Sequence, residues 1–567
     1  MRLAGVELPK VMADALQACR PHFVAAAVFS ALLNVLYLAP AIYMLQVYDR
    51  VLTTGGKMTL MFVTLALIVA LVTLAALDAI RGRLLVRASA RLDSILAPQI
   101  MQLMLSRGGR ENVQAMRDFD TIRQATSSQV TASLLDLPWA PIFIIVCFLL
   151  SVWLGVLAIA SIVLLMFIAK RHQDMTRRTV EEASRALAAS HASEQAASLQ
   201  AGTMRGLGMV QAMVDRQLAF RSTAINSAAR TQFIGSRYTA SSRFLRLFVQ
   251  SAGLGLGALL AVAGQMSSGG IIAGSILLGR ALQPIDGLIG GWSTLTSTRA
   301  ALARLAEMLG QPTDFDRIRT LLPDPEGRID VEQVGVRGSD GRPILLGVSF
   351  ATAPGEILGV IGPSGCGKTT LAKVVAGALE ADVGAVRIDG AQRSDWDQDA
   401  LGRFVGYLPQ EPSLFEGTIK ENIARFQPDH GSELDTDVIA AAKLAGVHEM
   451  ILKMPQGYDT RLGPMGSGLS AGQSQRIALA RALFRDPPIL VLDEPNAFLD
   501  ADGETALLEA LRRARARGAT ILLVAHRTSV LAIADRLLVI EAGKPKLLGP
   551  ANEVVARLTA PAAESAA

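Results

Sequence analysis

Residues 362–370 read Gly362-Pro363-Ser364-Gly365-Cys366-Gly367-Lys368-Thr369-Thr370, which fits the pattern GxxxxGK[ST] of a phosphate-binding loop. In such a loop the glycines let backbone N–H groups approach phosphate oxygens, the lysine reaches the terminal phosphates and the hydroxyl binds magnesium. The apolar residues 358–361 predict a buried strand before the loop, and residues 369–379 predict a helix whose N-terminus faces the phosphates. The stretch therefore predicts an α/β nucleotide-binding fold that takes ATP.

Two later stretches support the same site. The apolar run 488–492 predicts a buried strand, and it ends in Asp493 and Glu494, which would bring two carboxylates to a metal–nucleotide site. Between this run and the loop lies Leu469-Ser470-Ala471-Gly472-Gln473. Three elements in this order are poorly explained by coincidence, so we expect the protein to use ATP.

Composition points to a membrane. Of the 567 residues 51% are hydrophobic and 19% are charged, and the mean hydropathy is +0.36, which exceeds what an ordinary soluble core needs. The net charge of +5 could suit nucleic acid, but the arginines flank apolar stretches, so we interpret them as membrane-flanking charge and expect no nucleic-acid partner. Cys19, Cys147 and Cys366 have neither disulfide-framework nor zinc-ligand spacing.

Six apolar segments are long enough to cross a hydrocarbon layer of about 30 Å. They are residues 23–46, 58–79, 132–150, 152–169, 244–263 and 271–288, and the alternative is six buried helices of a large soluble protein. Long, arginine-rich connections occupy 81–131, beginning with Arg81, and 170–243, whereas the short connections carry little charge beyond Arg50 and Lys57. The positive-inside rule then places the long connections and both termini in the cytoplasm.

These assignments predict four regions. Residues 1–310 form the transmembrane domain with long cytoplasmic helices, 311–328 a linker rich in Pro, Gly and Asp, 329–558 the ATPase domain and 559–567 a disordered tail. Residues 108–118 and 203–213 are candidate contacts between the helix tips and the ATPase domain, and the alternative is that they are plain connecting turns.

The ordered motifs resemble those of an ABC transporter half-molecule, over essentially the whole length. Besides the loop and the carboxylates, residues 406–410 are similar to the Q-loop of that family, 469–473 to its LSGGQ signature, 496–500 to its D-loop and 524–527 to its switch-histidine segment. The resemblance implies a six-span α-helical transmembrane domain followed by an α/β P-loop nucleotide-binding domain, the ABC exporter architecture.

The resemblance also implies a role for each site residue. Lys368 would contact the β- and γ-phosphates, Glu494 would act as general base and His526 would hydrogen-bond the γ-phosphate, although a lone histidine is more often structural. The implied catalytic residues are Glu494, His526 and Gln410; the implied nucleotide-binding residues are Gly362, Ser364, Gly365, Cys366, Gly367, Lys368, Thr369, Thr370, Ser470, Gly472 and Gln473; and the implied magnesium ligands are Thr369, Gln410 and Asp493.

In the family, the signature segment of one chain caps the γ-phosphate bound to another, so the resemblance implies a homodimer with two sandwiched ATP molecules. The chain departs from the family pattern at two places. Ala471 replaces the usual glycine of the signature, and residues 334–341 offer no aromatic side chain where the family commonly stacks adenine. We therefore expect adenine to be held more weakly or by another surface.

Within the family, the chain is most similar to the permease-ATPases of bacterial type I protein secretion, the protease and lipase exporter group. The similarity rests on residues 136–141, 279–284 and 406–419. It implies export of an unfolded polypeptide with an uncleaved C-terminal signal across the inner membrane, through a periplasmic adaptor protein and an outer-membrane duct. A lipid or drug exporter is the alternative; a non-transporting regulatory ATPase is disfavoured because Lys368, Asp493, Glu494 and His526 are intact.

Two single residues carry further expectations. Arg280 falls near the middle of the last span, where a charge is costly, so we hypothesise that it lines the translocation path; the alternatives are pairing with an acidic residue and snorkelling to the interface. Cys366 lies inside the phosphate loop, so we expect its thiol to be open to alkylation and shielded by nucleotide.

Overall fold

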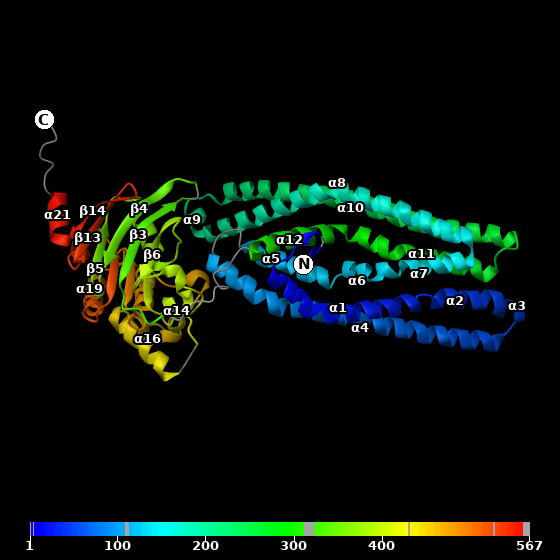
Figure 1. The fold of residues 1–567 in the computed structure, drawn as a ribbon, viewed down its shortest axis with the longest axis horizontal. Helices are drawn as coiled ribbons and strands as arrows, with labels where there is room; N and C mark the ends of the chain where they lie inside the picture. The colour runs from blue at the N-terminus through cyan, green and yellow to red at the C-terminus, as the bar shows by residue number, and fades with distance from the viewer. Residues whose placement is uncertain are drawn as a thin grey trace, which may run out of the picture. The chain divides into compact units, whose positions relative to one another are not determined.

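The computed structural model describes residues 2–3, 5–107, 113–310, 322–338, 340–428, 431–525 and 528–559. The chain divides into two compact units, Met1–Thr313 and Asp314–Ala567 (Figure 1). Most of the predicted linker, nearly all of the predicted tail and half of the candidate contact 108–118 lie outside the described residues.

The first unit is built almost entirely of helices. Six helical segments in the described part of the chain are long and apolar enough to cross a membrane, and each overlaps one predicted span: Lys10–Thr54, Lys57–Ser106, Gln129–Leu150, Val152–Thr176, Val210–Val262 and Ser268–Gly290. Their component helices are α1 (Lys10–Leu36), α2 (Ala39–Gln46), α3 (Leu52–Thr54), α4 (Lys57–Arg107), α6 (Gln129–Asp136), α7 (Ala140–Leu150), α8 (Val152–Leu199), α10 (Val210–Val262) and α11 (Ser268–Gly290). The shorter helices are α5 (Val113–Thr126), α9 (Ala201–Gly206) and α12 (Trp292–Gly310).

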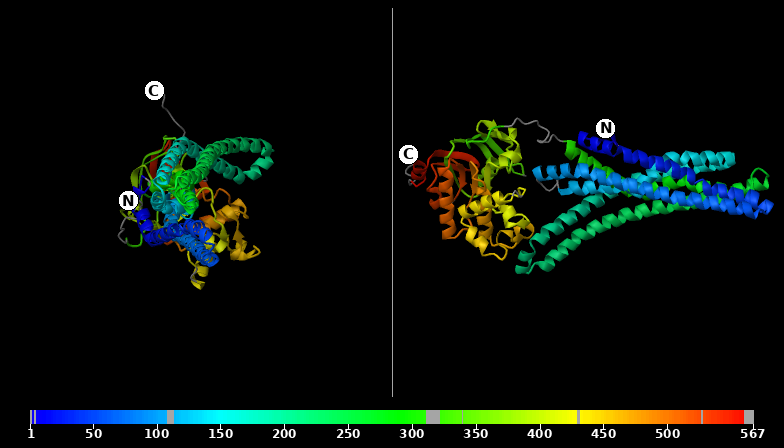
Figure 2. Two further views of the ribbon diagram at one scale, coloured as in Figure 1. Left: turned by 90° about the vertical axis from the view of Figure 1, so that its right-hand side faces the viewer. Right: turned by 90° about the horizontal axis from the view of Figure 1, so that it is seen from below.

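Apolar side chains cover the outside of this unit. In α4, no residue of the most hydrophobic 18-residue stretch is buried. Phe62 and Val72, for example, are 63% and 65% exposed. Side chains of this kind need a hydrocarbon surrounding, so the helical unit is that of a membrane protein. Helices α8 and α10 continue well beyond their apolar windows and run side by side (Figures 1 and 2).

A buried ionic network joins α1, α4 and α6. Arg81 is 5% exposed, and its guanidinium donates to Ser30 Oγ at 3.1 Å, to Asp136 Oδ1 at 2.8 Å and to Asp78 Oδ1 at 2.6 Å. Asn34 Nδ2 donates to the same Asp136 oxygen at 3.1 Å. Arg81, which follows the apolar run 58–79, therefore also links three helices through its guanidinium.

Two other carboxylates tie down α11. At its N-terminus, Asp49 accepts from Ser267 Oγ at 2.6 Å and from Gly269 N at 2.7 Å, so a residue of the first span caps the last one. Nearer its C-terminus, Asp286 pairs with Arg246 of α10 at 3.1 Å and accepts a short hydrogen bond from Ser242. The last span is thus fixed to the first and fifth by polar contacts as well as by packing.

The second unit is an α/β fold whose described residues form two main sheets and one two-stranded sheet, β9 (Gly417–Thr418) with β10 (Arg461–Leu462). The larger sheet has the strand order β14-β13-β5-β12-β11-β8, and only β14 is antiparallel to its neighbour. The smaller sheet, β4-β3-β6-β7, is antiparallel. Their strands are β3 (Ile329–Arg337), β4 (Pro343–Thr352), β5 (Ile357–Ile361), β6 (Val383–Ile388), β7 (Ala391–Gln392), β8 (Val405–Leu408), β11 (Ile489–Asp493), β12 (Thr520–Val524), β13 (Arg536–Glu541) and β14 (Lys544–Pro550).

Helices that matter for the site are α13 (Lys368–Ala376), α18 (Ala471–Leu483) and α19 (Ala501–Ala516). The helix predicted for 369–379 ends earlier, because Gly377 adopts a left-handed conformation (φ +75°) that closes α13. β5, β11 and β12 are almost completely buried and lie next to one another, so the segments after their carboxyl ends meet at one edge of the sheet. The predicted fold class is confirmed.

Candidate functional site

The phosphate loop connects β5 to α13, and glycine is required at two of its positions. At Gly362 (φ +155°) a Cβ atom would lie 2.1 Å from the carbonyl oxygen of Ile540, and at Gly367 (φ +102°) it would lie 2.6 Å from a methyl group of Leu345. Gly365 also has a positive φ, of +79°, but faces open space. The loop can therefore present its backbone N–H groups only with glycine at these turns.

Lys368 opens α13 and turns its amine back onto the loop. Its Nζ donates to the carbonyl oxygens of Gly362 at 2.9 Å and Pro363 at 2.8 Å, and the residue is only 6% exposed. Cys366 is equally buried, with Sγ 4.0 Å from that amine. The expectation of an open thiol at Cys366 is therefore wrong, since the loop folds over the side chain.

Asp493 ends β11 as a fully buried carboxylate, and neither of its oxygens has a hydrogen-bond partner within the described chain. Burial raises its pKa, and the charge of Glu494 adds to the rise, while Thr369 and nearby lysines oppose it. Thr369 Oγ1 lies 3.4 Å from Gln410 Oε1. A buried carboxylate without partners, beside a hydroxyl and an amide oxygen, is the all-oxygen donor set that suits Mg²⁺.

Glu494 is the next residue and holds a strained backbone. Its φ is +50°, unusual for a residue with a side chain, and its N–H donates to the carbonyl oxygen of Val524 at 2.8 Å. Strain of this kind persists where the surroundings fix it, commonly at reactive sites. His526 lies outside the described residues, but Val524, two residues earlier, pairs with Asp493 across the parallel strands.

The signature segment forms the start of α18. Ser470 caps the helix: its Oγ accepts from Gln473 N at 3.3 Å, and its own N–H donates to Gln473 Oε1 at 2.9 Å. Gly472 lies against Phe498, whose carbonyl oxygen would be 2.9 Å from an added Cβ. Ala471 is the exposed first residue of the helix, so its methyl group meets no buried neighbour.

The next motif joins this helix to α19. Asp500 caps α19 by accepting from Gly503 N at 2.9 Å, and Arg476 of α18 donates to the same oxygen at 2.5 Å. The hydrogen bond from Gly503, with help from Arg476, holds the pKa of Asp500 below its usual range. The two helices are thereby linked at their N-terminal ends.

Residues 334–341 contain no aromatic side chain that could stack on adenine, and two of their apolar side chains are not accessible. Val334 and Val336 are 0% and 4% exposed, because they point into the core of the small sheet. The half-buried Ile344 lies next to them in space: its Cδ1 would be 3.5 Å from a Cβ at Gly338, and its carbonyl oxygen 3.0 Å from one at Gly367. The main chain of Ile344 thus lies beside the loop at Gly367, whereas its side chain reaches Gly338.

In the membrane unit, Arg280 stacks on an aromatic ring. Its Cζ lies 4.0 Å from the ring centroid of Tyr37, and its Nη1 donates to Gln283 Oε1 at 2.9 Å. Within the described chain it forms no ion pair with a carboxylate. The alternative that Arg280 is neutralised by an acidic residue is therefore wrong for this structure, and the cation is shared between α11 and the end of α1.

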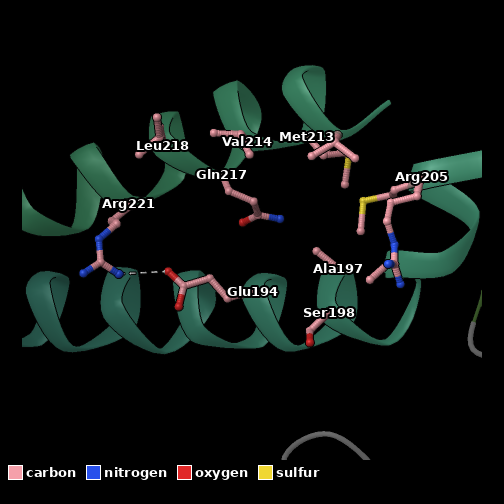
Figure 3. Close-up of a pocket in the computed structure, with 12 residues that line it drawn as sticks. Glu194, Ala197, Ser198, Arg205, Met213, Val214, Gln217, Leu218 and Arg221 are labelled. Carbon is pink, nitrogen blue, oxygen red and sulfur yellow. Dashed lines mark hydrogen bonds and ion pairs between the residues drawn. The ribbon is translucent and has the colours of Figure 1, made fainter. Parts of the chain in front are cut away.

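The tip of the α8–α10 hairpin carries a groove of about 430 Å³ (Figure 3). Apolar side chains such as Met204, Met213 and Val214 line it, and a 3.2 Å ion pair between Glu194 and Arg221 bridges its two helices. The candidate contact 203–213 falls here, as the end of α9, a turn and the start of α10.

Comparison with known proteins gives consistent relationships. Residues 345–497 match the family model described as "ABC transporter". The type I secretion system ATP-binding protein PrsD of Rhizobium meliloti (strain 1021) is 40% identical over 556 residues, covering 97% of this chain and 95% of that protein. The cyclolysin secretion/processing ATP-binding protein CyaB of Bordetella pertussis is 32% identical over 534 residues, covering 91% and 73%.

Among solved structures, a bacterial Atm1-family ABC exporter with ATP bound is similar in fold, with a TM-score of 0.82 at 23% identity, covering 97% of this chain and 99% of that one. Fold, motifs and full-length similarity agree: this chain belongs to the type I secretion ATP-binding proteins of the ABC transporter family.

Proposed function

We propose that this protein is the permease-ATPase of a type I secretion system, which hydrolyses ATP to move an unfolded polypeptide across the bacterial inner membrane. One observation carries the proposal: a buried, unpartnered Asp493 and a strained Glu494 stand at the edge of a parallel sheet in a chain that also has six apolar spans. Full-length similarity to PrsD favours polypeptide over the alternative cargo, a lipid or drug.

The residues divide the chemistry among them. Lys368, already held at the loop, contacts the β- and γ-phosphates, and Glu494 accepts the proton of the attacking water. Thr369, Gln410 and Asp493 hold magnesium, which when bound neutralises charge on the phosphate oxygens. The loop N–H groups and hydroxyls cradle the phosphates, from Gly362, Ser364, Gly365, Cys366, Gly367 and Thr370. His526 contacts the γ-phosphate.

A homodimer completes two such sites. Ser470, Gly472 and Gln473 start a helix whose N-terminus is exposed, and an anion bound to a second copy is stabilised there by the N–H groups and the helix dipole. Positive charge on the long connections orients the ATPase unit to the cytoplasm. A periplasmic adaptor protein and an outer-membrane duct receive the polypeptide, which carries a C-terminal signal.

The test is reconstitution of the full-length protein in lipid vesicles with cargo in unfolded form. An unfolded polypeptide with an intact C-terminal end should stimulate ATP hydrolysis and become protected inside inverted vesicles, whereas Glu494→Gln vesicles should bind ATP and transport nothing. Stimulation by small amphiphiles, with no response to any polypeptide, would establish the lipid or drug alternative.

A further inference from the structure

A second cavity, of about 810 Å³, lies between α8, α10 and α12. It begins at His172 and Thr176, where the apolar part of α8 ends, and reaches Gly290 at the end of the last span. Its size falls within the roughly 300–1,000 Å³ of pockets that enclose small ligands. The cavity is therefore large enough for a few residues of peptide, at the end of the spans that the proposed orientation places toward the cytoplasm.

One buried polar atom in this cavity lacks a partner. His172 is 4% exposed and lines the cavity, and its Nδ1 has no hydrogen bond in the described part of the chain. The ring is fixed by stacking on Tyr238, with centroids 4.9 Å apart and planes 25° apart. Because Nδ1 itself is enclosed, the stacked ring serves as a rigid part of the cavity wall.

A positive charge at the same cavity is also unpaired. Arg243 lines the wall and forms no ion pair with any described residue, whereas Arg246, less than one turn further along α10, pairs with Asp286. None of the described lining residues is acidic. A guanidinium with free donors in such a surrounding suits a carboxylate, which it can hold with two parallel hydrogen bonds.

The hydroxyl groups of the wall complement this charge. Thr231, Ser236 and Thr239 donate to carbonyl oxygens of their own helix, at 3.0, 3.0 and 3.1 Å, and Ser297 does the same on α12 at 3.0 Å. Because their protons are engaged, these oxygens offer lone pairs to the cavity. The site therefore combines acceptors for N–H groups with one cation for an anion.

We propose that this cavity binds a carboxylate-bearing segment of the exported polypeptide, with the carboxylate on Arg243 and backbone amides on the hydroxyl oxygens of the wall. The inference rests on the proposed function and names a binding site for its substrate. A peptide supplies both a carboxylate and N–H donors, whereas the phosphate group of a lipid supplies acceptors only. The alanine and valine side chains of the remaining wall suit apolar neighbours of the acidic residue.

The test uses the full-length protein in detergent and two pentapeptides amidated at the C-terminus, VDVEV and its counterpart VNVQV, which has no carboxylate. Each carries the same zwitterionic rhodamine dye, and binding is measured by fluorescence anisotropy. Wild type should bind the acidic peptide more tightly, and Arg243→Gln should lose roughly tenfold or more of that affinity, as expected for a charge-assisted pair. Thr239→Val removes one hydroxyl acceptor of the wall and should weaken both peptides. Arg237→Gln, an exposed arginine of α10 outside the cavity, is the matched control.

Basal ATP hydrolysis, measured for every variant, verifies that each is folded. Unchanged peptide affinity in Arg243→Gln overturns the site while leaving the proposed function standing, and so does export of a polypeptide by a wild type that binds neither pentapeptide. Displacement of the labelled peptides by phosphatidylglycerol added as mixed micelles, without preference between the two peptides, assigns the cavity to lipid and also overturns the site. If wild type neither binds nor transports any polypeptide, the proposed function itself fails.

Discussion

Arg81 should be far harder to replace than the acid it contacts in α6. The guanidinium contacts two carboxylates and a hydroxyl, so Arg81→Met leaves the largely buried Asp136 without its cation, while the half-exposed Asp78 keeps its contact with solvent. Removing one partner of a buried ion pair costs about 3–5 kcal/mol. In Asp136→Asn the arginine keeps Asp78 and Ser30, and the amide oxygen can still accept, so the loss is limited to part of one charge-assisted bond, about 1–2 kcal/mol.

The two variants should therefore separate in thermal stability. At about 2 °C per kcal/mol for a unit of this size, Arg81→Met should lower Tm by roughly 6–10 °C and Asp136→Asn by roughly 2–4 °C. Cys19 and Cys147 are fully buried in the membrane unit, so a thiol-reactive dye reports its unfolding once Cys366 is replaced by serine in every variant.

A control variant and a double variant test whether Arg81 is the centre of this network. Arg83→Met removes an exposed arginine of the same helix and should leave Tm within about 1 °C. The double variant Arg81→Met with Asp136→Asn should be more stable than the sum of the single losses predicts, because the two residues interact directly. If Asp136→Asn destabilises the protein as much as Arg81→Met, the arginine is not the shared centre of the network.

Three further outcomes test the site and the path. Glu494→Gln should retain ATP binding, seen with a fluorescent analogue, and lose about 10²-fold or more in turnover, as expected for a general base; wild-type turnover would contradict that role. Gly367→Ala should weaken ATP binding more than Gly365→Ala, because only at Gly367 does the new Cβ meet Leu345 at 2.6 Å; equal effects would mean that backbone strain alone decides. Arg280→Ala should reduce export in vesicles while basal ATP hydrolysis persists, and unchanged export would remove Arg280 from the path.

Local patterns predicted much of this protein. The phosphate loop and the strand that ends in Asp493 are contiguous in sequence, so their chemistry can be read without a fold, and the six spans are evident from the length of their apolar runs. Pattern does not reveal which side chains meet. Arg81 resembles any arginine beside a span until α1, α4 and α6 converge on it.

Other features depend on backbone shape. The positive φ of Glu494 arises because the chain must leave β11 while its N–H still pairs with Val524, a contact between strands that no motif records. The burial of Cys366 also depends on backbone shape. The glycines on either side of it, Gly365 and Gly367, have positive φ values, and the loop that they form covers the thiol. The open cavity at His172 needs three helices and was equally invisible in the sequence.

The reciprocal bonds between Ser470 and Gln473 bear on how easily the proposed dimer separates. The Ser470 N–H that an incoming phosphate would use is already occupied by the Gln473 side chain, a neutral acceptor at 2.9 Å. A charged acceptor forms a hydrogen bond about twice as strong as a neutral one, so phosphate can displace the amide. Closure then gains only the difference in strength between the bond to phosphate and the bond to the Gln473 amide. When the phosphate leaves, the amide returns and the helix is never left uncapped. In the proposed dimer, the Gln473 amide would thus replace the phosphate as the acceptor between cycles and would favour reopening.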